Sequence, residues 1–370
     1  MIIKGYWQVI SGLIGGVLPL ASRMHAPLVR ETIDLPLNGA QEFDDKMKKI
    51  GPHLFRLYSS VYGLVLTAVF CLTVGVGEAA SYYVATDGND GNTCAEAQNP
   101  SEAKLTIAQG INCLSSGDTL IIKGGTYNEG LYDPPSGNSS AEMTTVKGAP
   151  GETVIIKPDQ ANPIIAVDDP RSYISIENLI VDGNNKTSGY GVWLTAWHTR
   201  FKDLEFRQIG GIVFAVYKGD GDPEGSGSNE FTSIQIHDSG EACDHDYPET
   251  CLATHGFYVA TSDNLFDGVV VDGVPGHGIV IYDGNYSRKV GNIIRNSVFR
   301  NNSVGVSIFA GDDTVVENNL FENNGNPEFG TSTAIWVGGG SANTIIRNNT
   351  LLGTNDISVD QSATGTQIID

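Results

Sequence analysis

Two short alternating segments recur along the chain from about residue 176. The first begins and ends on apolar residues, as in IENLIV, and occurs at 176–181, 201–206, 231–236, 266–271, 294–299, 316–321 and 346–351. The second, as in GVWL, follows each copy at 191–194, 211–214, 256–259, 278–281, 305–308, 334–337 and 356–359. Successive side chains of a strand point to opposite faces. We therefore expect Val192 and Leu194 to enter a core and Trp193 to face outward.

The spacing of these copies indicates a solenoid. Neighbouring copies of the first segment start 22 residues apart between 294 and 316 and 35 residues apart between 231 and 266. The shorter spacing is one coil of a parallel β-helix, and the longer spacing is a coil that carries a loop. We predict an all-β, single-stranded, right-handed parallel β-helix at 171–370, preceded by an N-terminal segment at 81–170.

The two ends of this predicted stack differ. The stretch TIAQGINCL at 106–114 has apolar residues at helical spacing and predicts a short N-terminal capping helix. The sequence stops at TQIID without an evident cap. We expect either a truncated chain or an oligomer formed through the uncapped C-terminus.

One column of the aligned copies is rich in asparagine and other turn-forming residues. Stacked asparagines at a turn can pass hydrogen bonds from coil to coil, so we predict a structural rather than a catalytic role for them. The column contains Asn178, Asp203, Ser233, Gly268, Asn296, Asn318 and Asn348.

The first 80 residues resemble targeting sequence rather than a domain. Lys48, Lys49 and Arg56 precede an apolar run at 61–77, and small residues follow it. This layout predicts a secretory signal peptide at 47–80, hence a secreted or cell-surface protein without a membrane segment after cleavage. The alternative is an uncleaved anchor. Residues 1–46 are then a misassigned upstream extension, unless their apolar part packs as a helix or inserts into a membrane.

Cysteine usage is consistent with export. Four cysteines remain after the signal peptide, and the most local of their three possible pairings joins Cys94 to Cys113 and Cys243 to Cys251. We expect two disulfides. Four free thiols are the alternative if the chain stays in a reducing compartment.

Composition limits the possible partners. The 370 residues are 40% hydrophobic and 18% charged, with a net charge of −21. Such a charge repels the phosphates of nucleic acids, and it also repels a polyuronate unless bound cations intervene. We therefore expect no nucleic-acid partner.

Two predicted loops in consecutive coils concentrate acidic residues. In the first, Asp220, Asp222 and Glu224 alternate before a glycine, as ligands do at the start of calcium loops. Asp244 and Asp246 in the second loop could add ligands. Residue 231, the twelfth position of such a loop, is a phenylalanine, which excludes an EF-hand. We predict a Ca²⁺ site here, with an ordinary solvated acidic loop as the alternative.

Candidate acid–base residues lie beside these loops. His255 and His277 occupy the same place in adjacent coils and should lie about 5 Å apart. Neutral imidazoles can act as general acid and base, whereas a ladder in which each histidine bonds a backbone group is the structural alternative. Lys218, at the edge of the first loop, is the lysine placed best for proton abstraction.

Outward aromatic residues complete the candidate site. Trp193, Tyr258 and Trp336 share one column, and Tyr282 and Phe309 lie two residues further along other strands. Aromatic rings suit the apolar faces of sugars, although large aromatic residues also pack under loops.

Residues 82–130 resemble the N-terminal segment of the pectate-lyase-like right-handed β-helix superfamily. The similar elements are the YYVA strand, the Gly-Asn-Asp-Gly loop, Pro100, the helix start at Thr106 and the GDT and GTY strings at 117–119 and 125–127. The superfamily includes polysaccharide lyases, uronan epimerases, glycoside hydrolases, tailspikes and adhesins. Its epimerases carry an Asp-Pro-His-Asp type motif, which this sequence lacks.

This resemblance implies a carbohydrate-active protein. Lyases of this kind use a Lys or Arg base beside calcium held by Asp residues. We predict a polysaccharide lyase acting on a uronate-containing glycan, in which a cation at the first acidic loop neutralises the substrate carboxylate and Lys218 or His255 takes the proton. The alternatives are a glycoside hydrolase using two carboxylates from the same loops and a non-catalytic adhesin or glycan-binding β-helix.

Overall fold

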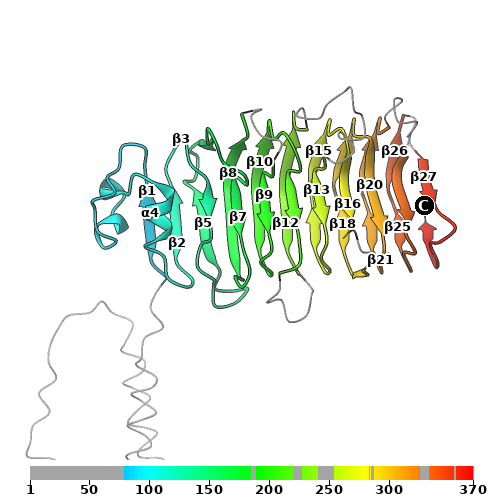
Figure 1. Cartoon of the computed structure of the whole chain (residues 1–370), viewed down its shortest axis with the longest axis horizontal. Coiled ribbons are helices and arrows are strands. Elements are labelled where there is room, and N and C mark those ends of the chain that lie inside the picture. Colours follow the sequence, from blue (N-terminus) through cyan, green and yellow to red (C-terminus); the bar gives the residue numbers. More distant parts are fainter. Residues whose placement is uncertain are drawn as a thin grey trace, which may run out of the picture. The chain divides into compact units, whose positions relative to one another are not determined.

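The structure is a computed structural model that describes residues 79–184, 189–219, 227–240, 254–282, 284, 287–325, 333–353 and 356–369. These residues belong to one unit, Gly77–Asp370, in which parallel strands wind in successive coils from β1 to β28 (Figure 1). The predicted extension at 1–46 and nearly all of the predicted signal peptide lie outside the described residues. No described helix has the length and apolar character needed to cross a bilayer.

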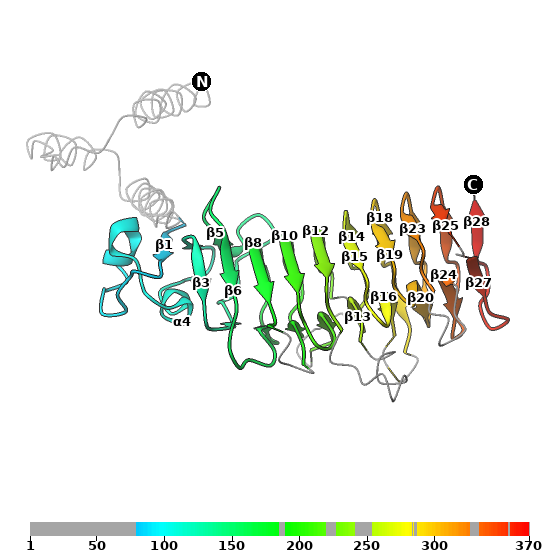
Figure 2. The same cartoon turned by 90° about the horizontal axis from the view of Figure 1, so that it is seen from above.

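Two large parallel sheets form the walls of the stack, and Figure 2 shows them on opposite sides, with β18 and β19 facing one way and β16 and β20 the other. The nine-stranded sheet contains β4 (Leu131–Tyr132), β7 (Ile165–Val167), β9 (Val192–Leu194), β11 (Phe214–Val216), β13 (Phe257–Val259), β16 (His277–Ile281), β20 (Val304–Phe309), β24 (Thr333–Gly338) and β27 (Asp356–Val359).

The seventeen-stranded sheet bends at its middle, so each coil crosses it in two steps. The first step is made by β1 (Ser81–Val84), β2 (Thr119–Ile122), β5 (Thr144–Gly148), β8 (Ile174–Asp182), β10 (Arg200–Arg207), β12 (Glu230–His237), β14 (Leu265–Asp267), β18 (Ile293–Arg295), β22 (Val315–Glu317), β25 (Ile345–Arg347) and β28 (Gln367–Ile369). The second step is made by β3 (Gly125–Tyr127), β6 (Val154–Ile156), the ends of β8, β10 and β12, then β15 (Val270–Asp272), β19 (Val298–Arg300), β23 (Leu320–Glu322) and β26 (Thr350–Leu352). A small pair, β17 (Lys289–Val290) and β21 (Gly311–Asp312), completes the strands.

The bend confirms the turn predicted from the asparagine column. The ladder of hydrogen bonds that passes from coil to coil, however, is made by residues that directly follow members of that column. Every residue of that column has φ between 52° and 67°, a left-handed conformation that Asn, Asp and Gly tolerate best. This conformation turns Asn318 outward and the next side chain inward. The Ser297 N–H donates to Asn319 Oδ1 at 2.9 Å, and Asn319 Nδ2 donates to Asn349 Oδ1 at 3.0 Å. Asn296 instead donates to Asp267 of the preceding coil.

The core between the sheets is built from stacked columns of apolar side chains. Val192 and Leu194 are fully buried and Trp193 is partly exposed, as predicted. The predicted segment at 211–214 was misaligned by two residues: the strand is β11, and Phe214 pairs with Val192. The reason is packing, since the Phe214 ring lies 4.6 Å from Phe206 and is surrounded by other core phenylalanines.

The N-terminal end of the stack is covered as predicted, by a shorter helix. The helix α4 spans Ile107–Ile111, begins at a Thr106 cap that accepts the Gln109 N–H at 3.3 Å, and buries both of its isoleucines. Two short helices, η2 (Glu96–Gln98) and η3 (Pro100–Glu102), precede it. A disulfide joins Cys94 to Cys113 with 5.3 Å between Cα atoms, which confirms that half of the predicted pairing.

Candidate functional site

The outer face of the nine-stranded sheet carries two columns of side chains, called here the first and second outer columns. Strand register brings the first column together from Tyr132, Ala166, Trp193, Ala215, Tyr258, Val280, Ser307, Trp336 and Ser358. The second column lies two residues further along each coil and contains Asp168, Thr195, Tyr217, Ala260, Tyr282, Phe309, Gly338 and Asp360.

Six successive coils, those of β9, β11, β13, β16, β20 and β24, each place one aromatic ring in one of these two columns. The partner position in the same coil is small, as with Thr195 beside Trp193, Ala215 beside Tyr217 and Gly338 beside Trp336. Strands are spaced by about 4.8 Å, so the rings form a strip about 24 Å long. We call this strip the aromatic ladder, and its members are Trp193, Tyr217, Tyr258, Tyr282, Phe309 and Trp336.

Neighbouring rings of the aromatic ladder touch along its whole length. Their centroids are separated in order by 4.9, 5.4, 6.2, 5.9 and 4.9 Å, and Tyr190 extends the first ring at 5.0 Å. Each ring is partly exposed. Ring planes differ by 38° and 39° in the first two contacts and by more than 70° in the last three. The strip therefore presents a mixture of ring faces and ring edges.

The sequence placed most of the aromatic ladder correctly and missed one member. Trp193, Tyr258 and Trp336 share a column, as predicted, and Tyr282 and Phe309 lie two residues further along. Tyr217 was missed because the segment at 211–214 was misaligned. With Phe214 opposite Val192, the residue three further on falls into the second outer column.

The two histidines lie side by side under the middle of the aromatic ladder. The rings of His255 and His277 are 5.1 Å apart and nearly perpendicular, and the His255 ring is 5.9 Å from Tyr258. The His277 backbone N–H donates to His255 Nδ1 at 3.3 Å, and His277 Nδ1 lies 2.6 Å from the hydroxyl of Ser307. His255 thus bonds a backbone group, as the structural alternative expected.

Burial keeps both imidazoles neutral near pH 7. Loss of water and the neighbouring His277 hold the pKa of His255 well below its usual value, and burial lowers the pKa of His277 to about 4. Ser307 is fully buried. His255 is buried, whereas His277 keeps part of its surface accessible, so only His277 is open to proton transfer with a ligand. The clearest role of the pair is to support Tyr258 and the strands on either side.

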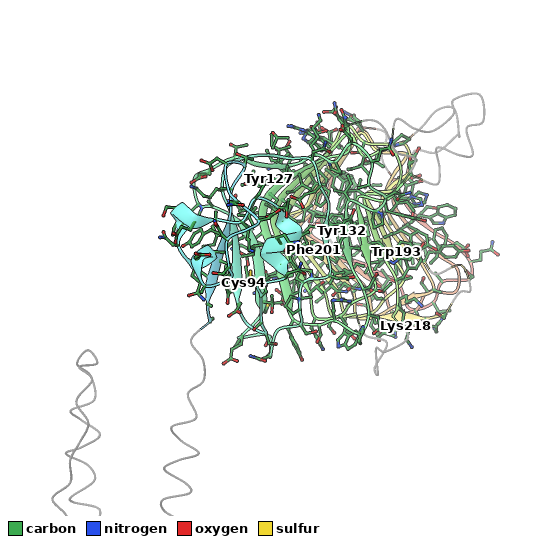
Figure 3. The ribbon with its side chains drawn as sticks, turned by 60° about the vertical axis from the view of Figure 1, so that its left-hand side comes forward. Cys94, Tyr127, Tyr132, Trp193, Phe201 and Lys218 are labelled. Carbon is green, nitrogen blue, oxygen red and sulfur yellow. A yellow bond between two sulfur atoms is a disulfide. The ribbon has the colours of Figure 1, made fainter. Side chains whose placement is uncertain are left out.

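Lys218 is exposed and directly follows Tyr217 of the aromatic ladder. Figure 3 shows Lys218 and Trp193 on the same side of the unit, with Tyr132 near them. The predicted calcium ligands Asp220, Asp222, Glu224, Asp244 and Asp246, and the cysteines Cys243 and Cys251, lie outside the described residues. Among the residues that the structure does describe, no group of three or more His, Cys, Asp or Glu side chains is arranged to hold a metal ion.

The two outer columns carry no formal charge along the aromatic ladder. From β9 to β24, neither described column contains an Asp, Glu, Lys, Arg or His residue, and the carboxylates Asp168 and Asp360 lie just beyond its two ends. The seventeen-stranded sheet differs, because its outer positions carry ion pairs between neighbouring coils. These pairs include Arg295 with Asp267 at 2.8 Å, Arg300 with Asp272 at 2.8 Å, Arg347 with Glu317 at 2.6 Å, and Asp182 with both Lys157 at 3.2 Å and Arg207 at 3.0 Å.

Comparisons with known proteins agree with this architecture. The family described as the right handed beta helix region matches residues 164–351. No curated protein matches the sequence. Among solved structures, the complex of XylC with xylose is similar at a TM-score of 0.56 and 12% identity, over 78% of this chain and 68% of that one.

Two further solved structures have the same fold. A rhamnogalacturonan lyase aligns at a TM-score of 0.55 and 15% identity, over 78% of this chain and 87% of its own. The ORF18 protein of Geobacillus virus E2 aligns at a TM-score of 0.52 and 14% identity, over 78% of this chain and 61% of its own. The predicted fold is confirmed, and at these identities the likeness concerns the fold alone.

Proposed function

The chain belongs to the right-handed β-helix family, and from this premise we propose that it is a carbohydrate-active protein that binds a polysaccharide along its aromatic ladder. The observation that carries the proposal is the placement of one partly exposed ring in each of six successive coils. A site that repeats along an axis matches a ligand that repeats along an axis. Aromatic rings with hydroxyl or N–H tips supply the apolar and polar contacts that sugars need.

The solved neighbours support the same class of ligand. XylC was solved with xylose, and another similar structure is a rhamnogalacturonan lyase, so two proteins of this fold handle carbohydrate. Export, predicted from residues 47–80, would bring the chain to compartments where polysaccharides occur. The disulfide between Cys94 and Cys113 supports export because such bonds persist in oxidising compartments.

Replacement of the first-column aromatics tests the proposal. The triple variant Trp193→Ala, Tyr258→Ala, Trp336→Ala should weaken polysaccharide binding by roughly tenfold or more, since each aromatic contact contributes about 0.5–1.5 kcal/mol. Affinity electrophoresis in gels containing each of a panel of soluble polysaccharides provides the measurement. The matched control, Glu317→Ala with Arg347→Ala on the seventeen-stranded sheet, should bind as the parent does. Equal binding by the triple variant and the parent would refute the proposal.

A second candidate function is β-elimination on a uronate chain, favoured by the exposed Lys218 beside Tyr217 and by the neutral imidazole of His277. In that reaction a base removes the proton α to the uronate carboxylate, the bond to the leaving sugar oxygen breaks, and an unsaturated uronate remains. The Ca²⁺ predicted at Asp220, Asp222 and Glu224 would neutralise the carboxylate. Ultraviolet absorbance of unsaturated products, with and without a chelator, tests this candidate, and Lys218→Ala should abolish it.

A further inference from the structure

We infer that the aromatic ladder selects an uncharged polysaccharide and holds it parallel to the axis of the coils. The inference rests on the proposed function and adds the chemical class and direction of the ligand. The inference rests on three observations: the two described outer columns lack charged residues along the ladder, the rings are in register with the coils, and Tyr217 and Trp193 have uncharged polar tips.

Among the described residues, the two outer columns offer no row of cations along the ladder. An anionic polymer brings a carboxylate with each charged sugar, and each one placed on an apolar surface loses hydration unless a cation meets it. Of the described cations close to this face, Arg171 pairs with Asp133 at 3.2 Å, and Arg288, which donates to the Gly340 carbonyl, pairs with Asp312. Lys218 is exposed at a single coil. Asp168 and Asp360 at the two ends, and the net charge of −21, add repulsion.

The spacing of the rings sets the direction of the ligand. Each coil advances by about 4.8 Å, close to the length that one extended pyranose adds to a chain. A polysaccharide parallel to the axis therefore meets about one ring per sugar, whereas a chain crossing the sheet meets only the two outer columns. Within the two described columns, Ala215, Ala260 and Gly338 are small enough to let a chain lie on the neighbouring rings.

The polar atoms of the ladder are uncharged donors and acceptors. Tyr217 supplies a phenol and Trp193 an indole N–H in two successive coils. Burial raises the pKa of Tyr217, so its phenol stays protonated through the physiological range. Phenols and indoles hydrogen-bond to sugar hydroxyls without demanding a counter-charge.

The inference is tested by binding of the full chain to soluble neutral polysaccharides (xylan, glucomannan, hydroxyethylcellulose) and to anionic ones (polygalacturonate, alginate). Affinity electrophoresis and calorimetry are run at low and high salt, with calcium and with a chelator. We expect at least one neutral polymer to bind, with less than about twofold change on adding salt or chelator, because screening acts on charges. Affinity for its oligosaccharides should rise with length up to about six sugars, one for each coil.

Two conservative variants sharpen the test without threatening the fold. Tyr217→Phe removes one hydroxyl and should weaken neutral binding by about two- to tenfold, as for one lost hydrogen bond. Asp360→Asn removes a charge at the end of the ladder, where Asp360 is exposed, and should change neutral binding by less than twofold.

The outcomes separate the two proposals. Binding to no polysaccharide at all would overturn the proposed function. Preferential binding to polygalacturonate or alginate, lost with chelator and strengthened by Asp360→Asn, would overturn the inference, leave carbohydrate binding standing and favour the β-elimination candidate. Affinity that stops rising at two sugars would overturn the direction along the axis.

Discussion

The two sheets of the unit both stack outward side chains in columns, but the columns differ in their chemistry. On the seventeen-stranded sheet, outward positions hold charged side chains that pair with an opposite charge on the coil before or after. Their hydrogen-bonding groups are therefore occupied within the protein. On the nine-stranded sheet, outward positions hold rings that touch their neighbours and still keep part of their surface in water. The comparison shows that repetition alone does not make a binding surface. A binding surface also needs side chains whose surface remains available to a ligand after the coils have bonded to one another.

Substitution in the core shared by both sheets should cause the largest loss of folding stability. Phe214→Ala removes a fully buried ring on β11 and should destabilise the fold by about 3–5 kcal/mol. Phe309→Ala removes a partly exposed ring of the aromatic ladder and should cost about 1 kcal/mol. Urea unfolding followed by circular dichroism measures both. Equal losses would mean that the ladder is part of the core rather than a surface upon it.

Acid should weaken the nine-stranded sheet through its histidines. The unfolded imidazole takes up a proton near its ordinary pKa of 6.5, but folded His277 does so only near 4. The unfolded state therefore binds more protons between these values, and the free energy of unfolding falls as pH drops from 6.5 towards 4. Since part of the His277 residue remains accessible, we expect a loss of about 2 kcal/mol.

The variant His277→Gln isolates this contribution. It should flatten the decline of urea midpoints between pH 6.5 and 4, because its amide does not titrate. His255 titrates in the same direction and will leave a residual slope. If the variant and the parent lost stability in parallel, the histidine pair would have no part in the acid response.

Breaking an ion pair of the seventeen-stranded sheet should cause the smallest loss of folding stability. Arg295→Ala breaks a pair whose side chains are 39% and 25% exposed, so we expect a loss of about 0.2–1 kcal/mol that shrinks in high salt. Polysaccharide binding should not change. Urea midpoints at two salt concentrations measure the first effect, and a loss above about 2 kcal/mol would place these pairs among the main sources of stability.

The sequence predicted the coils because strand alternation is a local property that the core enforces. The predictions from sequence were wrong where the outcome depends on the direction of a side chain or on its packing in the core. The alignment at 211–214 followed a glycine pattern, but the β11 register follows the size of the Phe214 side chain. The asparagine column marked the turn correctly, but residue types alone do not show that Asn319, rather than Asn318, points inward.

The candidate site was predictable to a similar degree. Alignment of the repeated segments placed Trp193 and Tyr258 in one column and His255 next to His277. It could not show that His255 would be buried and His277 partly buried, because burial depends on which residues of the neighbouring coils cover them. The calcium site and the second disulfide remain predictions, since their residues lie outside the described ranges.

The ion pairs also limit how such a chain can gain or lose coils during evolution. Along one outer column of the seventeen-stranded sheet the signs alternate with a period of two coils, through Lys147, Glu177, Lys202, Thr232, Asp267, Arg295, Glu317 and Arg347. Deleting one coil from within a charged run, such as that of Glu177 or Arg295, would put like charges together, whereas deleting two successive charged coils would keep the alternation.

The coil of β12 is the exception. Thr232 lies between Lys202 and Asp267, and His237 occupies the matching place after Arg207. Without this coil, Lys202 would meet Asp267 and the alternation would continue unbroken. Coils should therefore be exchanged in pairs elsewhere, while this single coil can be lost without creating like-charge contacts. Its duplication would place Glu230 beside a second Glu230.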